Sequence, residues 1–365
     1  MLKMNLFSKK TLEISVLCAL LVLVSITSCF SGLRERLLER RQLKQQRESP
    51  VSTSSACDGL IPEIKEGYGA DGPYNMDIRT ISNPLWNGEQ ISVFFPKGAI
   101  GQLPVILFSH AFGASDWKRA YIPFMRHMVS RGWIVVFSPY QTVGASFDER
   151  YATLWKGFDL AVQNFGNQMD LTRVGFVGHS FGGGATPAMA YKGLVKKGWG
   201  KKGAFIYILA PWYSFQISSE ELRQLPSNVV MIMQVYDKDV TNDHRMALDI
   251  YRNVQLPNNQ KHFQVVRSDN INGCEIVADH ATPSRNPSLR LKQYSVFKTF
   301  DAVADYVFNG KTEGNQAISR TNLPSEKGSY QPLLIESNPK PQASQKSYQF
   351  PWDNNKNPRR SLESW

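Results

Sequence analysis

The stretch that decides the fold reads Val174-Gly175-Phe176-Val177-Gly178-His179-Ser180-Phe181-Gly182-Gly183-Gly184. A short continuous apolar run is typical of a buried strand in a parallel sheet, and the segment 182–197 behind it suits a helix. The pattern Gly-x-Ser-x-Gly between a strand and a helix predicts a tight turn that projects the Ser180 hydroxyl from the sheet edge. Side chains at Gly178 and Gly182 would collide there with the neighbouring strand and helix.

Apolar runs and helical segments alternate on both sides of this turn. The expected strands are Val105–Ser109, Trp133–Ser138, Val174–Val177, Ala204–Leu209, Val229–Val235 and Phe263–Val266. The expected helices lie near 117–131, 149–165, 182–197, 241–254 and 288–308. Such alternation implies right-handed crossovers and a doubly wound α/β fold with a mostly parallel sheet. Before it, turn residues separate the extended runs 77–82 and 90–95, which predicts an antiparallel hairpin.

The charge of the chain lies mainly outside its middle. Of the 365 residues 42% are hydrophobic, which allows a sizeable core and excludes disorder of the whole chain. The net charge of +11 would by itself suggest a nucleic-acid partner. However, residues 1–50 carry +5 and residues 311–365 carry +3, which leaves +3 for residues 51–310. We therefore expect no nucleic-acid-binding domain.

The amino terminus has the pattern of a targeting segment. Three lysines precede an apolar run from Ile14 to Ile26, which suits a signal-peptide core and is too short to span a bilayer. The run ends Ile26-Thr27-Ser28-Cys29, which resembles the lipobox of bacterial lipoproteins. This resemblance implies a signal peptide over 1–28, lipidation at Cys29 and attachment to the membrane. Phe30 in place of Asp implies the outer membrane, by resemblance to Gram-negative lipoproteins. Ordinary cleavage, giving a periplasmic or cell-surface protein, and an uncleaved anchor remain alternatives.

Two polar segments flank the expected domain at 57–310. Residues 29–56 predict a charged tether, with a basic amphipathic helix over Leu33–Arg47 as the alternative. Residues 311–365 are rich in Asn, Ser, Gln, Pro and Lys and predict a mostly extended, flexible tail. Within this tail, the aromatic segment Tyr348–Trp352 is a candidate for packing on the domain.

Processing would leave two of the four cysteines in the exported protein. Cys18 would leave with the signal peptide and Cys29 would carry lipid, so Cys57 and Cys274 remain. An exported pair is a disulfide candidate, and two buried free thiols are the alternative. We find no metal-ligand spacing, and we expect neither a metal nor an organic cofactor.

The turn around Ser180, with its strand and helix, resembles the α/β-hydrolase family over residues 74–308. The resemblance implies that Ser180 is a nucleophile and that the N–H of Phe181 contributes to an oxyanion hole. His110-Ala111-Phe112-Gly113 follows an earlier strand and resembles the family's His-Gly-x oxyanion loop. The second oxyanion N–H would then belong to Phe112. His110 itself is expected to be a structural residue at the strand end.

A serine nucleophile needs a histidine base, and the histidine needs a carboxylate that fixes its tautomer. In this family the chain order is Ser, acid, His. Asp239 matches the spacing of the family's Gly-x-x-Asp turn after the strand that begins at Val229, with Asp237 and Asp243 as reserve candidates. His280 follows the last strand and is the expected base. Three other histidines lie on helices or at the wrong end of the sheet, namely His127, His244 and His262.

The length of the loop before the acid-bearing strand indicates which substrates can reach the site. Only 19 residues separate Leu209 from Val229, so we expect no large cap domain and an open site. Ala210-Pro211-Trp212 resembles the bacterial cutinase and polyester-hydrolase branch, close to dienelactone-hydrolase-like esterases. This implies that Trp212 lines the acyl cleft, with ordinary packing as the alternative.

We expect a serine hydrolase for carboxylic esters, bulky or extended ones included. An acyltransferase with the same triad and a non-catalytic surface lipoprotein are the alternatives.

Overall fold

The computed structural model describes residues 37, 40, 55–319 and 330–362. The chain divides into two units, Met1–Pro50 and Val51–Trp365, and every element described below belongs to the second. The expected signal peptide, Cys29 and nearly all of the expected tether lie outside the described residues. Among the residues that are described, no helix has the length and hydrophobicity needed to cross a membrane.

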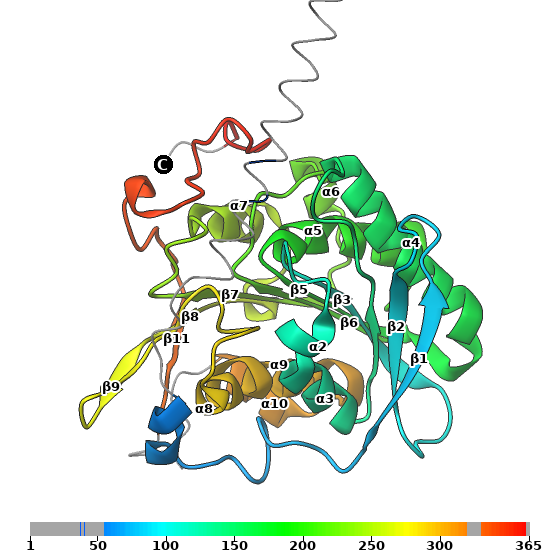
Figure 1. Cartoon of the computed structure of the whole chain (residues 1–365), viewed down its shortest axis with the longest axis horizontal. Coiled ribbons are helices and arrows are strands. Elements are labelled where there is room, and N and C mark those ends of the chain that lie inside the picture. Colours follow the sequence, from blue (N-terminus) through cyan, green and yellow to red (C-terminus); the bar gives the residue numbers. More distant parts are fainter. Residues whose placement is uncertain (1–36, 38–39, 41–54, 320–329, 363–365) are drawn as a thin grey trace, which may run out of the picture. The chain divides into compact units, whose positions relative to one another are not determined.

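A nine-stranded sheet forms the centre of the second unit, in the order β1-β2-β4-β3-β5-β6-β7-β8-β11 (Figure 1). Its strands are β1 (Met76–Ser82), β2 (Gln90–Pro96), β3 (Leu103–Ser109), β4 (Ile134–Phe137), β5 (Met169–His179), β6 (Gly203–Leu209), β7 (Val229–Tyr236), β8 (Lys261–Val266) and β11 (Leu333–Glu336). The strands from β4 to β8 pair in parallel, whereas β1 and β2 pair antiparallel and β11 runs antiparallel to β8. The predicted α/β class, the mostly parallel sheet and the antiparallel hairpin are confirmed.

Helices cover both faces of this sheet (Figure 1). One face carries α4 (Phe147–Phe165), α5 (Phe181–Ala190), α6 (Ser219–Arg223) and α7 (Arg245–Asn253). The other carries α2 (Trp117–Ala120), α3 (Ile122–Ser130), α8 (Leu289–Lys292), α9 (Lys298–Asn309) and α10 (Thr312–Ser319). The connection between β6 and β7 contains only the short helix α6. A separate ribbon pairs β9 (Asp269–Ile271) with β10 (Cys274–Ile276).

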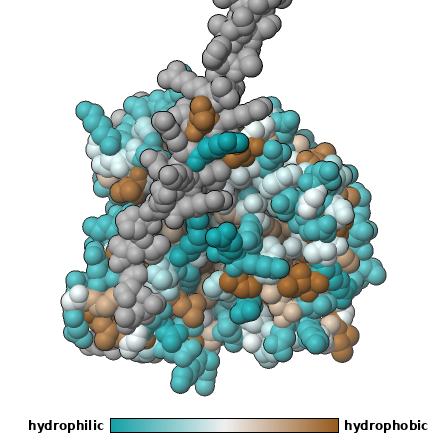
Figure 2. Space-filling view, viewed as in Figure 1, coloured by the Kyte–Doolittle hydropathy of each residue, from teal (hydrophilic) through white to brown (hydrophobic). Residues whose placement is uncertain are grey.

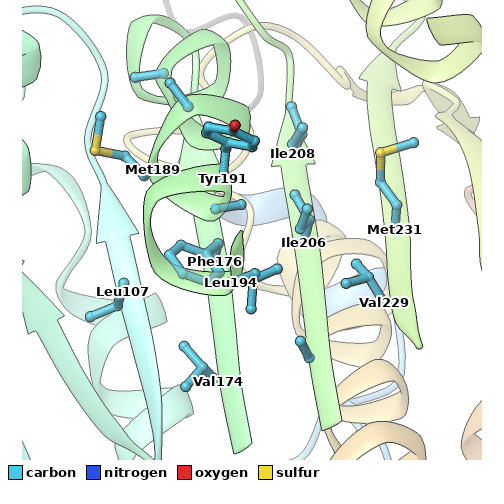
Figure 3. Packing of buried hydrophobic residues seen from close by; sticks show 14 of the residues in the cluster. Leu107, Val174, Phe176, Met189, Tyr191, Leu194, Ile206, Ile208, Val229 and Met231 are labelled. Atoms are coloured by element: carbon cyan, nitrogen blue, oxygen red, sulfur yellow. The ribbon is translucent and has the colours of Figure 1, made fainter. Parts of the chain in front are cut away.

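Apolar side chains of the parallel strands point alternately to the two faces of the sheet. On β3, Val105 and Leu107 belong to one buried cluster, whereas Ile106 and Phe108 belong to the other. Figure 3 shows part of the first cluster, in which side chains of β5, β6 and β7 meet those of α5 and of the π-helical turn Tyr191–Lys196. Burial on both faces explains why these strands are continuous apolar runs. On the face drawn in Figure 2, most described residues are hydrophilic or intermediate.

Local side-chain chemistry fixes several helix ends. Ser146 and Glu149 form a capping box at the start of α4, and Ser218 and Glu221 form another at the start of α6. The α9 helix ends at Gly310, whose left-handed φ of 70° suits glycine. These signals define where α4 and α6 begin and where α9 ends.

The described residues after 310 differ from the expected flexible tail. They form α10, add β11 to the edge of the sheet, and bury Trp352 and Arg359, each 3% exposed. The polar composition is misleading because a segment that packs on an existing domain needs only a few apolar anchors. A polar composition predicts that a segment cannot form a hydrophobic core of its own. It does not predict whether the segment packs on a domain that is already folded, as this one does.

The structure joins Cys57 to Cys274 in a disulfide, with their Cα atoms 5.6 Å apart. Cys57 lies in the 3₁₀ turn Ser55–Leu60, and Cys274 begins β10. The carboxylate of Asp58, the residue after Cys57, accepts hydrogen bonds from the Ser288 hydroxyl and from the Leu289 backbone N–H at the start of α8. The segment between Cys274 and α8 contains His280, so the disulfide and Asp58 hold both ends of that segment.

Candidate active site

Ser180 lies in a strained turn between β5 and α5. Its φ of 57° and ψ of −119° are unusual for a residue with a side chain and cost about 1–3 kcal/mol. The neighbouring strand holds this conformation, because the Ser180 N–H donates to the Leu209 carbonyl oxygen at 2.9 Å. The Ser180 carbonyl in turn accepts the N–H of Trp212 at 2.8 Å. The turn is therefore fixed on both sides by backbone from β6 and the loop behind it.

The flanking glycines are required by close packing. A Cβ atom on Gly178 would overlap the Thr186 hydroxyl and the Gly182 carbonyl of α5. A Cβ atom on Gly182 would overlap the Ser109 carbonyl at the end of β3. The expectation that side chains here would collide with the neighbouring helix and strand is confirmed. The close approach brings the start of α5 against the loop that follows β3.

Three of the predicted site residues meet at the carboxyl ends of the strands. His280 Nε2 lies 2.8 Å from Ser180 Oγ, and His280 Nδ1 lies 2.8 Å from Asp239 Oδ2. A carboxylate only accepts hydrogen bonds, so Nδ1 carries the proton that Asp239 accepts. Nε2 is then free of a proton and accepts the Ser180 hydroxyl. The Ser180 residue is 5% exposed, and the side chains of Asp239 and His280 are 1% and 16% exposed.

Asp239 is held as an anion. Burial by itself would raise its pKa, but the electrostatic attraction of the His280 ring and the hydrogen bond from that ring outweigh burial and place the pKa below the usual value. Its second carboxylate oxygen accepts the N–H groups of Thr241 at 2.7 Å and Asn242 at 3.2 Å. Asn242 also donates from its side chain to the Ala210 carbonyl at 2.9 Å. The loop after Asp239 thus orients the carboxylate and ties it to the end of β6.

The two reserve carboxylates bind other groups. Asp237 accepts the Ser268 N–H at 2.9 Å and the Ser268 hydroxyl at 2.6 Å. Asp243 accepts from the Arg245 guanidinium at 3.0 Å and from the Trp352 N–H at 3.0 Å. The contact with His280 is therefore made by Asp239.

The loop that carries His280 is supported from inside the protein. The Asn286 amide donates to the Val277 carbonyl at 2.9 Å, closing the segment on both sides of His280. The buried Lys292 ammonium donates to the Ser284 carbonyl at 2.8 Å and to that of Asn286. Burial lowers the pKa of Lys292 to about 8. These contacts fix the base relative to the sheet.

A chain of hydrogen bonds joins the base loop to the loop after β3. His179 Nε2 lies 2.8 Å from the His280 carbonyl oxygen, and His179 Nδ1 lies 2.9 Å from the Tyr121 hydroxyl. Burial and the nearby His280 lower the pKa of His179 well below its usual value, so its ring is neutral. Nε2 therefore donates to the carbonyl and Nδ1 accepts from Tyr121. The Tyr121 oxygen accepts the Ala111 N–H at 2.9 Å, which completes the chain.

The predicted oxyanion residues lie at the same sheet edge as Ser180. Phe181 begins α5, where the first N–H groups have no partner within the helix. Phe112 lies in the loop after β3, whose last residue, Ser109, pairs with Gly178 of β5. His110 is fully buried and stacked on Tyr140, and burial lowers its pKa to about 3. A neutral, enclosed His110 fits the structural role expected for it.

Trp212 forms an aromatic surface beside the nucleophile. Its ring lies 5.8 Å from that of Phe181, the residue after Ser180. Two more half-buried rings join it, with Phe147 at 5.7 Å and Phe215 at 5.8 Å from Trp212. We call Phe147, Trp212 and Phe215 the aromatic wall. Ala210, with a φ of 44°, makes the sharp bend that brings Trp212 back toward Ser180.

Three residues near the site had no role in the sequence interpretation. His179 belongs to the quoted motif, but its type alone does not show which carbonyl it binds. Tyr121 lies in a stretch expected to be one continuous helix, with no sequence sign of a buried hydroxyl contact. Phe350 contacts Trp212 and belongs to the aromatic segment of the tail, which was the only available signal.

Comparison with known proteins assigns the chain to no family: no family model matches its sequence, and no curated protein matches it. Within the described ranges, no three or more His, Cys, Asp or Glu side chains form a group suited to hold a metal ion. The function is therefore inferred from the fold and from the site geometry.

Proposed function

We propose that the protein is a serine hydrolase of the α/β-hydrolase class that cleaves carboxylic esters through an acyl-enzyme. The observation that carries this proposal is the alignment of Ser180, His280 and Asp239 by two contacts of 2.8 Å. They follow one another along the chain in the order Ser, Asp, His, and the serine occupies a strained strand-to-helix turn. A strained residue held by its surroundings is typical of functional sites.

Acylation follows from this geometry. Ser180 Oγ attacks the ester carbonyl carbon while its proton moves to His280 Nε2, and Asp239 stabilises the resulting imidazolium. The N–H groups of Phe181 and Phe112 would stabilise the negative oxygen of the tetrahedral intermediate. The ester C–O bond then breaks, and His280 gives its proton to the leaving alcohol. The acyl group remains on Ser180 as an ester.

Deacylation reverses these roles with water as the nucleophile. His280 Nε2 accepts a proton from the water as its oxygen attacks the acyl carbon. The bond to Ser180 Oγ breaks, the proton returns to Ser180, and the carboxylic acid leaves. The short connection between β6 and β7 adds no large domain over this edge, which fits bulky or extended esters.

The test is hydrolysis of p-nitrophenyl esters by the wild type, Ser180→Ala and His280→Ala. We expect kcat to fall by about a million-fold in each variant, because the residues of such a triad act as a unit. The exposed Ser227→Ala is the matched control and should retain wild-type rates. A fluorophosphonate probe should label the wild type and Ser227→Ala but not Ser180→Ala. Equal background rates in all four proteins, without labelling, would refute an enzymatic role.

We also propose that the protein is an exported lipoprotein anchored to the outer membrane through Cys29. The pattern Ile26-Thr27-Ser28-Cys29 carries this proposal, and the disulfide between Cys57 and Cys274 fits an oxidising compartment. Palmitate labelling that disappears in Cys29→Ser, and processing that globomycin blocks, would support it. A mature protein with an unmodified Cys29 would refute it.

A further inference from the structure

The carboxyl-terminal segment Tyr348–Trp352, which we call the strap, pairs with the loop that directly follows Asp239. The Gln349 N–H donates to the Val240 carbonyl at 2.8 Å, and the Phe350 N–H donates to the Thr241 carbonyl at 2.9 Å. The Phe350 carbonyl accepts the Asp243 N–H at 3.1 Å. The strap therefore runs beside the acid loop as a short parallel strand would.

Contacts on the far side of the strap keep it in place. The Trp352 N–H donates to the Asp243 carboxylate at 3.0 Å, and its side chain is buried. The Tyr213 hydroxyl donates to the Pro351 carbonyl at 2.7 Å. Further along, the buried Arg359 guanidinium binds Asp249 on α7. A segment anchored at this many points can present a side chain in a defined position.

Phe350 is the strap residue that faces the site. Alternate residues of an extended segment share one side, so Tyr348, Phe350 and Trp352 point the same way; of these three, Tyr348 and Trp352 are 7% and 3% exposed, and Phe350 is the one left half-buried. Its ring lies 5.6 Å from that of Trp212, edge to face. The backbone N–H of Trp212 donates to the Ser180 carbonyl, so one residue separates Phe350 from the nucleophile.

The same residue is close to the acid. The Thr241 carbonyl accepts the Phe350 N–H, and the Thr241 N–H donates to Asp239 Oδ1. Phe350 thus lies between the acid loop and Trp212, and it leaves part of its apolar ring uncovered beside another half-buried aromatic ring. Partly exposed aromatic groups that meet beside a nucleophile form a surface for an apolar part of a substrate.

We propose that Phe350 is a specificity-determining residue that extends the aromatic wall and contacts the acyl group of the ester. This inference rests on the proposed esterase function. The preferred substrates are esters whose acyl group is long or aromatic enough to pass Trp212 and reach the strap. An acetyl group is too short for this contact, so its hydrolysis does not depend on Phe350.

The experiment compares p-nitrophenyl acetate, octanoate and benzoate with the wild type, Phe350→Ala and Phe350→Leu. Because each buried methylene changes an affinity about fourfold, Phe350→Ala should lower kcat/KM about tenfold for octanoate and benzoate. The value for acetate should stay within about twofold, since no methylene contact is lost. Phe350→Leu, which keeps an apolar side chain, should recover octanoate hydrolysis more fully than benzoate hydrolysis. Gln349→Ala, an exposed neighbour with the same backbone pairing, is the control and should match the wild type.

Two outcomes would overturn the inference. Equal losses for all three esters would mean that Phe350 only supports the acid loop, and unchanged selectivity in both Phe350 variants would mean that it contacts no substrate. If Phe350→Ala fails to fold, the octanoate-to-benzoate ratio of Phe350→Leu still decides between these cases. A wild type that hydrolyses no ester would instead refute the proposed function, a result that does not depend on any Phe350 variant.

Discussion

His179 Nε2 donates to the backbone carbonyl of His280 across 2.8 Å, so the residue before the nucleophile holds the loop that carries the base. The same ring accepts from Tyr121, which in turn accepts the Ala111 N–H. One uninterrupted set of hydrogen bonds therefore spans the nucleophile turn, the base loop and the expected oxyanion loop. Buried networks of this kind specify one geometry when every member is satisfied. We infer that Tyr121 is a positioning residue.

Tyr121→Phe tests this inference by removing only the hydroxyl at the centre of the chain. The buried Ala111 N–H and His179 Nδ1 lose their partner, which costs about 1–3 kcal/mol and loosens the geometry of the site. We expect kcat for p-nitrophenyl esters to fall about tenfold while KM changes less than about twofold, because substrate contacts remain. Steady-state kinetics on the wild type and on Tyr121→Phe measure kcat and KM separately.

Tyr191→Phe is the matched control for Tyr121→Phe. The Tyr191 hydroxyl donates to the Gln224 side chain at 3.1 Å, away from the triad, and its loss should leave kcat unchanged. A Tyr121→Phe enzyme that is less stable but has the wild-type kcat would mean that the hydroxyl serves stability alone. In that case the hydrogen bonds would not position the site.

Asp239→Asn should separate the acid from its reserve candidates. An amide can present its NH₂ group to Nδ1 and favour the wrong tautomer of His280, so we expect kcat to fall by about 1,000- to 10,000-fold. Asp237→Asn changes a carboxylate that binds Ser268, and it should stay within a few-fold of the wild type. Rates for the two variants at neutral pH decide the assignment. A larger loss in Asp237→Asn than in Asp239→Asn would contradict it.

The sequence predicted the strands from β1 to β8, but it gave no sign of the ribbon β9–β10 or of the edge strand β11. Ser180, Asp239 and His280 each follow an apolar run, and their order along the chain matches the order of the strands that position them. The contacts of Tyr121 and Phe350 join segments far apart in the chain, and nothing local encodes them. Tyr121 lies between α2 and α3, where Pro123 in the first turn of α3 marks a break in the expected helix 117–131. This break places the Tyr121 ring in the core.

His127 should make the stability depend on pH. Its ring lies between Asp71 at 2.8 Å and the buried Asp301 at 3.0 Å. Burial alone would lower the pKa of His127, but the two carboxylates outweigh burial and raise it above the usual 6.5. A raised folded-state pKa contributes stability that is fully present below the unfolded value and is lost as pH rises through the folded value.

The measurement for His127 is the free energy of unfolding of the wild type and of His127→Gln at pH 6 and pH 9. We expect the advantage of the wild type over His127→Gln to be larger at pH 6. Taking the difference removes the opposing effect of the other buried histidines, such as His110, whose lowered pKa costs stability as pH falls. A difference that is the same at both pH values would show that His127 stays neutral.

Arg359→Leu tests whether the carboxyl-terminal segment unfolds together with the sheet. The Arg359 guanidinium lies 3.1 Å from Asp249 Oδ1 and donates to the Ile217 carbonyl at 2.9 Å, with both charged residues buried. Removing one partner leaves the other charge buried without its counter-ion, so we expect a loss of about 3–5 kcal/mol in denaturant unfolding. The double variant Arg359→Leu/Asp249→Leu should recover much of this loss, because no charge then remains buried.

Arg223→Leu is the control for the Arg359 experiment, since Arg223 pairs with the exposed Glu220 and should contribute less than about 1 kcal/mol.

A single transition for Arg359→Leu, shifted to lower denaturant, would place the segment in the same cooperative unit as the sheet. A double variant as unstable as the single one would mean that lost packing, and not an unpaired charge, causes the loss. An early separate transition would instead show that the segment detaches first, and the strap with Phe350 would then leave the acid loop before the sheet unfolds.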